Sequence, residues 1–202
     1  MMRVFLAVEL SSPARDRIAA LQYEWKPRIQ SARWVRPENL HLTLRFLGEV
    51  TPSVVSALAE TLPQSVRGCR PLRFSLRGGG CFPNVKRPRV VWLGVDPVPD
   101  ELHRVHGAVD EAVRRHGFPP EARGFEPHLT IARVKTLPSE TSAETSAETS
   151  EPPLMSALEE RDFGETRVSE IVLFESRLSP RGASYHAVER VRLGGTGREQ
   201  LV

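Results

Sequence analysis

The sequence contains two short histidine–threonine motifs of the same form, His41-Leu42-Thr43-Leu44 and His128-Leu129-Thr130-Ile131. Alternate residues of an extended strand point to the same face, so each histidine projects beside its threonine while the apolar residues project behind them. Histidine can donate or accept a proton near neutral pH, and a threonine hydroxyl can hold a phosphoryl oxygen. Two such motifs facing each other would supply an acid and a base to one substrate. The residue pattern therefore predicts a site for acid–base catalysis.

The two motifs belong to a longer internal repeat. A shift of 87 positions, the separation of His41 and His128, also places the apolar run 4–9 on the run 91–96. Each half is therefore predicted to form a strand, a helix and a second strand that opens with His-x-Thr. A single histidine on a strand is more often a packing or surface residue, and the matched repetition favours catalysis instead. The other histidines lack such a match and are interpreted as surface or packing residues: His103, His106, His116 and His186.

Paired histidines also occur in metal sites, but neither motif carries the further ligands that such a site needs. No Asp, Glu or Cys lies at ligand spacing within either motif, so we expect neither a metal nor another cofactor. Cys69 and Cys81 lack the spacing of a zinc site and are too few for a disulfide framework. This use of cysteine is typical of a cytoplasmic protein.

Length and composition indicate a soluble globular protein. The 202 residues fit one domain or two small lobes on a shared core, and we predict a single bilobal domain over residues 1–202. Hydrophobic residues make up 40% and charged residues 26%, as in ordinary soluble domains. No apolar run approaches the roughly 18 residues that span a bilayer, and the first residues do not resemble a signal peptide. We therefore expect a cytoplasmic protein without membrane contact.

Arginine dominates the cations of this chain, whose net charge is +3. The planar guanidinium group suits phosphate because it donates two hydrogen bonds at once. One stretch, 67–89, is especially basic, and two interpretations of it stay open: a patch for nucleic acid or a solvated surface. Its basic residues are Arg67, Arg70, Arg73, Arg77, Lys86, Arg87 and Arg89.

Apolar periodicity predicts alternating strands and helices. Strands are predicted at 3–9, 41–47, 72–77, 89–95, 127–134, near 167–175 and at 184–192. Helices are predicted from Ser12 to Trp25, from Pro52 through Leu62, from Pro99 to His116 and from Pro153 to Glu160. Gly78-Gly79-Gly80 is predicted to belong to the turn region before strand 89–95. Because no Gly-rich nucleotide-binding loop accompanies these elements, the predicted fold class is α+β rather than doubly wound.

One segment, 138–151, is of low complexity. It repeats Ser-Ala-Glu-Thr units and contains no aliphatic residue larger than alanine. Such a segment cannot support a packed core, so we predict a disordered loop and assign it no function.

The residues around both motifs resemble the two-histidine phosphoesterase superfamily. The specific resemblance is to RNA 2′,3′-cyclic phosphodiesterases, also called LigT-like 2′-5′ RNA ligases. It is carried by residues 33–48 and 125–134 and by a closing segment that runs from Glu175 to Tyr185. The resemblance extends from Arg3 to Leu193, and only the Ser-Ala-Glu-Thr tract departs from it.

The resemblance implies a bilobal fold in which two antiparallel sheets face each other across a central, metal-free cleft, with helices outside. The implied reaction opens a 2′,3′-cyclic phosphate at an RNA 3′ end to give a 2′-phosphomonoester. His41 would be the proton donor to the departing 3′ oxygen, and His128 the proton acceptor that activates water. Thr43 and Thr130 would hold the non-bridging oxygens. The implied partner is RNA with a cyclic phosphate end, such as a tRNA fragment, bound by a monomer.

The resemblance also suggests Arg133 as a phosphate or substrate contact. Strict alternation would put Arg133 on the opposite face from His128. Only a bulge or the end of the strand could place it on the same face as His128. Arg45 is the alternative cation, because alternation places it on the side of His41. Phe46 or Tyr185 is a candidate for stacking on a base, although core packing is favoured for Phe46.

Three functions remain compatible with the sequence. The favoured one is metal-independent hydrolysis of RNA 2′,3′-cyclic phosphates, which can also run in reverse as 2′-5′ ligation when an RNA 5′-hydroxyl replaces water. The second is a phosphodiesterase for another cyclic or 2′-5′ nucleotide. The third is an RNA-binding module without turnover, which the presence of both histidines disfavours.

Overall fold

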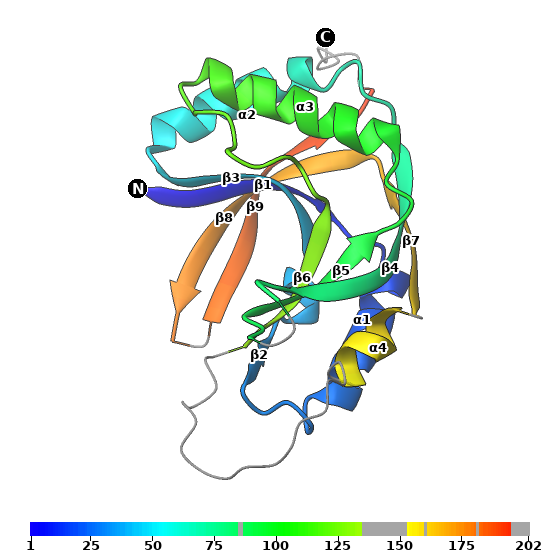
Figure 1. The fold of residues 1–202 in the computed structure, drawn as a ribbon. Coiled ribbons are helices and arrows are strands. Elements are labelled where there is room, and N and C mark those ends of the chain that lie inside the picture. Colours follow the sequence, from blue (N-terminus) through cyan, green and yellow to red (C-terminus); the bar gives the residue numbers. More distant parts are fainter. Residues whose placement is uncertain (85–86, 135–152, 160, 181, 195–202) are drawn as a thin grey trace.

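Two antiparallel sheets form the framework of the protein (Figure 1). The computed structural model describes residues 1–84, 87–134, 153–159, 161–180 and 182–194. Sheet A has the strand order β3 (His41–Val50), β1 (Met2–Glu9), β8 (Glu170–Ser179) and β9 (Gly182–Arg192). Sheet B has the order β2 (Ala32–Trp34), β6 (His128–Val134), β5 (Val90–Val95), β4 (Leu72–Phe82) and β7 (Asp162–Val168). The predicted α+β class and the two antiparallel sheets are confirmed.

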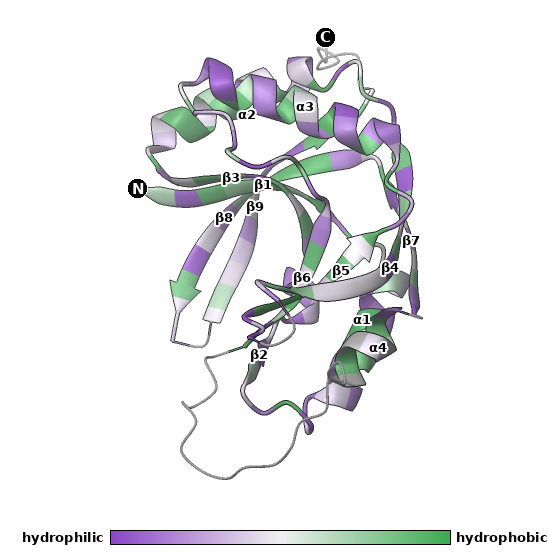
Figure 2. Cartoon of the chain, viewed as in Figure 1, coloured by the Kyte–Doolittle hydropathy of each residue, from purple (hydrophilic) through white to green (hydrophobic). Residues whose placement is uncertain are grey.

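Helices cover the outer faces of both sheets. They are α1 (Ser12–Trp25), α2 (Pro52–Ser65), α3 (Asp100–Arg115) and α4 (Pro153–Glu159). The short 3-10 helix η1 (Pro37–Asn39) contacts α1 and leads into β3. α1 begins where the Ser11 hydroxyl accepts a hydrogen bond from the Ala14 amide, with Pro13 in the first turn. Figure 2 shows hydrophobic and hydrophilic residues interspersed along these helices, as expected for helices that bury one side.

Two of the helices cross between the halves of the chain. α1 follows β1 of sheet A, yet it packs against β7 of sheet B. α3 follows β5 of sheet B, yet it packs beside α2 against β3 of sheet A. The apolar stripe of each helix is therefore buried on the sheet that carries the other half's motif, and one hydrophobic cluster contains residues of both sheets. The prediction of a single bilobal domain over 1–202 stays a prediction.

The predicted glycine turn is wrong, because Gly78-Gly79-Gly80 lies inside β4. A Cβ on Gly79 would lie 2.5 Å from the Trp92 carbonyl oxygen, and a Cβ on Gly80 would lie 2.7 Å from the Trp92 ring. Gly78 has a φ of +65°, and the β4–β5 register shifts between Leu76 and Gly79. These glycines therefore allow the close approach of Trp92 and a strand irregularity, rather than a chain reversal.

The predicted strand near 167–175 is divided between the two sheets. β7 ends at Val168 in sheet B, and β8 begins at Glu170 in sheet A. Ser169 lies between them, and its carbonyl accepts a hydrogen bond from the Leu193 amide. The apolar pattern is continuous across this crossing because both strands border the same core.

A bulge lies at the last residue of each histidine motif, which is the same place in the repeat. On β3, Thr43 and Arg45 pair with consecutive residues of β1, so Leu44 has no partner there. On β6, Thr130 and Ala132 pair with consecutive residues of β5, so Ile131 is the extra residue. Each bulge buries two successive side chains and then reverses the alternation of the strand.

The bulge in β6 is anchored by two hydrogen bonds from the first half of the chain. The Ile131 carbonyl accepts them from the buried Gln22 Nε2 at 3.1 Å and from the Val35 amide at 2.9 Å. Because Gln22 lies on α1, the helix of the first half secures the strand that carries the second motif.

None of the described helices is long and apolar enough to cross a membrane. The low-complexity segment 138–151 lies outside the described residues.

Candidate active site

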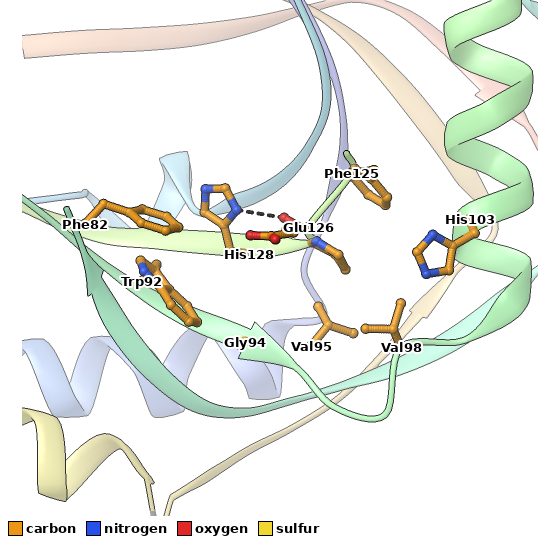
Figure 3. A pocket seen from close by; sticks show the side chains of 10 residues that line it. Phe82, Trp92, Gly94, Val95, Val98, His103, Phe125, Glu126 and His128 are labelled. Atoms are coloured by element: carbon orange, nitrogen blue, oxygen red, sulfur yellow. Dashed lines mark hydrogen bonds between the residues drawn. The ribbon is translucent and has the colours of Figure 1, made fainter. Parts of the chain in front are cut away.

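The same hydrogen bond orients both motif histidines. Nδ1 of His41 lies 2.7 Å from the Asn39 carbonyl oxygen, at the end of η1. Nδ1 of His128 lies 2.8 Å from the Glu126 carbonyl oxygen (Figure 3). A carbonyl can only accept, so Nδ1 carries the hydrogen in each ring. Nε2 is therefore left in both histidines as the nitrogen that can take up or release a proton.

Each imidazole is contacted by aromatic side chains. We call the face of sheet A that carries His41, and the face of sheet B that carries His128, the inner face of that sheet. The Phe5 ring lies 4.8 Å from His41, and Tyr185 meets the same imidazole edge-on at 5.1 Å. Phe82 meets His128 edge-on at 5.3 Å, and Trp92 lies 6.2 Å from it. Of these four aromatic residues only Tyr185 was a candidate from the sequence, although the 87-position shift places Phe5 on Trp92.

The environment of His41 favours its neutral form. Burial lowers the pKa of His41 below the usual value, and the positive charge of Arg133 lowers it further. The hydrogen bond to Asn39 opposes these effects without cancelling them. A nearby phosphate anion would compensate the Arg133 charge and help His41 to hold a proton.

The motif threonines lie where alternation predicts. Thr43 and Thr130 are half-buried, next to the buried Leu42 and Leu129. Within the described part of the chain, neither hydroxyl has a hydrogen-bond partner. β3 and β6, the strands of the two motifs, contact each other. Both hydroxyls are therefore available to a bound oxyanion.

The bulges exchange the expected positions of two arginines. Arg133 follows the β6 bulge, so it is exposed on the same face as His128, and its charge acts on His41. Arg45 follows the β3 bulge and is only 4% exposed, so its predicted place on the side of His41 is wrong. Phe46 is 60% exposed and contacts Phe5, so its predicted place in the core is also wrong.

Arg45 instead joins the first motif strand to the chain that leads into the second motif. Its Nη1 lies 3.5 Å from Asp110 Oδ1 on α3 and 3.2 Å from Glu121 Oε1 in the following loop. Its Nη2 donates to the Pro119 carbonyl. Arg45 thus holds the loop that continues to Glu126, whose carbonyl orients His128.

A pocket of about 360 Å³ opens beside His128 (Figure 3). Aromatic and aliphatic side chains form most of its wall, and His103 lies on the side opposite His128. The Phe125 ring stacks on His106 at 4.0 Å, and burial lowers the pKa of His106. Of the two predicted alternatives for His106, surface or packing, these contacts favour packing. The lining residues are Phe82, Trp92, Gly94, Val95, Val98, His103, Phe125, Glu126, Pro127 and His128.

Among the described residues, no three His, Cys, Asp or Glu side chains converge as a set of metal ligands.

The Arg-rich stretch 67–89 includes exposed ion pairs, such as Arg73 with Glu165 and Arg77 with Asp162. These two arginines are therefore partly neutralised on the surface.

The chain matches the family model "LigT like Phosphoesterase" over residues 8–92 and again over 93–185. It is 37% identical to the RNA 2′,3′-cyclic phosphodiesterase of Methanothermobacter thermautotrophicus over 191 residues, 95% of this chain and 98% of that protein. It is 32% identical to the protein of the same name from Thermotoga maritima, over 96% of this chain and 97% of that protein.

Solved structures share the fold. The protein TT0787 of Thermus thermophilus has a TM-score of 0.77 and 28% identity, covering 96% of this chain and all (100%) of that chain. Escherichia coli LigT in complex with 3′-AMP has a TM-score of 0.72 and 26% identity, covering 96% of this chain and 99% of that chain.

The role of Arg45 predicts a large difference between two arginine substitutions. Arg45→Ala removes a buried guanidinium group and its contacts with the partly exposed Asp110 and Glu121, so we expect a loss of about 3 kcal/mol in the free energy of unfolding. Arg115→Ala removes an exposed pair with Glu111 on α3 and should cost about 0.5 kcal/mol or less. Urea unfolding measures both. Equal losses would contradict the structural role of Arg45.

The electrostatics of His41 predict a shift that NMR can follow. In histidine-labelled protein, His41 should titrate below the usual pKa of about 6.5. Arg133→Gln removes a positive charge that disfavours the imidazolium, so the pKa of His41 should rise. Arg114→Gln, on the exposed side of α3, is the control and should leave the pKa of His41 unchanged. An unchanged titration in Arg133→Gln would mean that Arg133 does not act on His41.

Proposed function

This chain belongs to the LigT-like phosphoesterase family, and from that premise we propose that it hydrolyses RNA 2′,3′-cyclic phosphates. The product is a 2′-phosphomonoester with a free 3′-hydroxyl. The observation that carries the proposal is the matched pair of histidines, each with Nδ1 bound to a backbone carbonyl and Nε2 left for proton transfer. The names of the relatives support the same activity.

The proposed mechanism uses the two histidines in opposite protonation states. His128 Nε2 takes a proton from water as the water oxygen forms a bond to phosphorus. The bond from phosphorus to the 3′ oxygen breaks, and His41 Nε2 gives its proton to that oxygen. The low pKa of His41 makes its imidazolium a ready donor, and the anionic substrate helps to keep it protonated until the transfer.

The remaining polar groups act on the phosphate oxygens. The unpartnered hydroxyls of Thr43 and Thr130 donate hydrogen bonds to the non-bridging oxygens, where negative charge accumulates in the transition state. Arg133 adds a positive charge on the side of His128, and its field reaches His41. No step of this mechanism requires a metal or another cofactor.

The substrate is proposed to be the 3′ end of an RNA, with tRNA fragments as one source, bound by a monomer in the cytoplasm. The same geometry supports ligation, because an RNA 5′-hydroxyl can replace the water. Attack by that hydroxyl with departure of the 3′ oxygen creates a 2′-5′ linkage.

The reaction is tested on a short RNA that ends in a 2′,3′-cyclic phosphate, with protein pretreated with EDTA. We expect a terminal monophosphate, identified as the 2′ isomer by comparison with synthetic 2′- and 3′-phosphate standards. Release of inorganic phosphate from this product by a phosphatase identifies the product as a phosphomonoester. His41→Ala and His128→Ala should each lower the rate by about 10²–10⁴-fold, since each removes a positioned acid or base.

The outcomes of that assay separate the alternatives. Activity that disappears with EDTA and returns with a metal would overturn metal independence. Turnover of another cyclic or 2′-5′ nucleotide, with the RNA end left intact, would change the substrate class. Binding of RNA without any turnover would favour a binding module. His186→Ala, at an exposed histidine of β9, is the matched control and should retain full activity.

The assignment of acid and base is tested with a cyclic substrate in which sulfur replaces the 3′ oxygen. A thiolate leaves without a proton, so this substrate should restore turnover to His41→Ala. It should not restore His128→Ala, because the water still needs a base. Rescue of His128→Ala alone would reverse the two roles.

A further inference from the structure

Arg33 on β2 lies directly opposite Arg133 in the antiparallel ladder of sheet B. Directly opposed residues share one face of a sheet, and their Cβ atoms lie about 4.5–5.5 Å apart. The neighbours of Arg33, Ala32 and Trp34, pack against the core on the other face. Arg33 is therefore exposed on the inner face, beside Arg133.

This pairing of like charges is unfavourable in the unliganded protein. In the part of the chain that the structure describes, neither Arg33 nor Arg133 has an ion pair or side-chain hydrogen bond. Arg73 and Arg77 on β4, by contrast, form ion pairs with Glu165 and Asp162 on β7. Two adjacent, unneutralised guanidinium groups are therefore a feature of this edge of the inner face.

The arginine pair borders the candidate active site. Arg133 follows Thr130 on the same strand and acts electrostatically on His41. Arg33 is one strand further out, on the edge strand β2, so it lies beyond Arg133 as seen from the histidines. A ligand that reaches Arg33 must extend past the group that the histidines act on.

We propose that Arg33, together with Arg133, binds the phosphodiester one nucleoside upstream of the cyclic phosphate in the RNA strand. The inference rests on the proposed function and specifies its substrate as a polynucleotide end. A phosphodiester carries one negative charge and two non-bridging oxygens, which two guanidinium groups can contact from adjacent strands. The bound phosphate would also relieve the repulsion between Arg33 and Arg133.

The test compares two substrates that differ in the upstream phosphodiester. One is a trinucleotide that ends in a 2′,3′-cyclic phosphate, and the other is a nucleoside 2′,3′-cyclic monophosphate, which has no phosphate on its 5′ side. Arg33→Gln should lower kcat/KM for the trinucleotide by about tenfold, the effect of one charge-assisted hydrogen bond. The loss should appear mainly in KM, and the mononucleotide should be opened at the wild-type rate.

Two further variants control for charge and for the guanidinium shape. Arg114→Gln removes the same charge from the exposed side of α3 and should leave both substrates unaffected. Arg33→Lys should recover part of the trinucleotide activity, because it keeps the charge without the planar fork. At low salt, the melting temperature of Arg33→Gln should be no lower than that of the wild type, since the substitution removes the repulsion between the charges of Arg33 and Arg133.

Salt dependence gives an independent measure of the contact. For the trinucleotide, the slope of log KM against log salt concentration should be about 0.7 smaller in Arg33→Gln, the value for one phosphate contact on a single strand. Equal losses on both substrates, or no loss on either, would overturn the proposal.

A failure of the proposed function would be recognised separately. In that case the wild-type protein would open neither substrate. The contact would then be tested by the binding of fluorescent trinucleotide to wild type and Arg33→Gln. An equal affinity and an equal salt slope would overturn it.

Discussion

The site depends on burying the apolar residues that alternate with its catalytic candidates. Leu42 and Leu129 are 0% exposed, while the histidine before each and the threonine after each remain accessible. Burial of a leucine side chain contributes roughly 1.5–3 kcal/mol. A slip of either strand by one residue would move its leucine to the surface and its His and Thr into the core. The register of β3 and β6 is therefore strongly specified, and the direction of both histidines with it.

The core beneath the motifs is built by exchange between the halves of the chain. α1 of the first half packs on sheet B, and α3 of the second half packs on sheet A. Gln22 on α1 binds the Ile131 carbonyl in the bulge of β6. Arg45 on β3 binds Asp110 on α3 and Glu121 in the loop that leads to His128. The first half thus helps to position the second motif, and α3 of the second half packs against the strand of the first motif.

The repeat makes the two sides of the site similar in backbone and different in charge. Under the 87-position shift, Arg133 matches Phe46, and both are exposed after equivalent bulges. The side of His41 therefore has an aromatic ring where the side of His128 has a cation. Burial lowers the pKa of His41, and that cation lowers it further. The two imidazoles therefore lie in different electrostatic environments.

Local information was sufficient for much of the protein. The sequence alone determined the two motifs, the faces of their histidines and threonines, most elements and the α+β class, because these depend on residue type and periodicity. Tertiary structure decided the places of Arg45, Phe46 and Arg133, since a bulge arises from pairing with another strand. It also placed the glycine triplet within β4 and divided β7 from β8. Those outcomes depend on contacts between distant segments, which no local pattern contains.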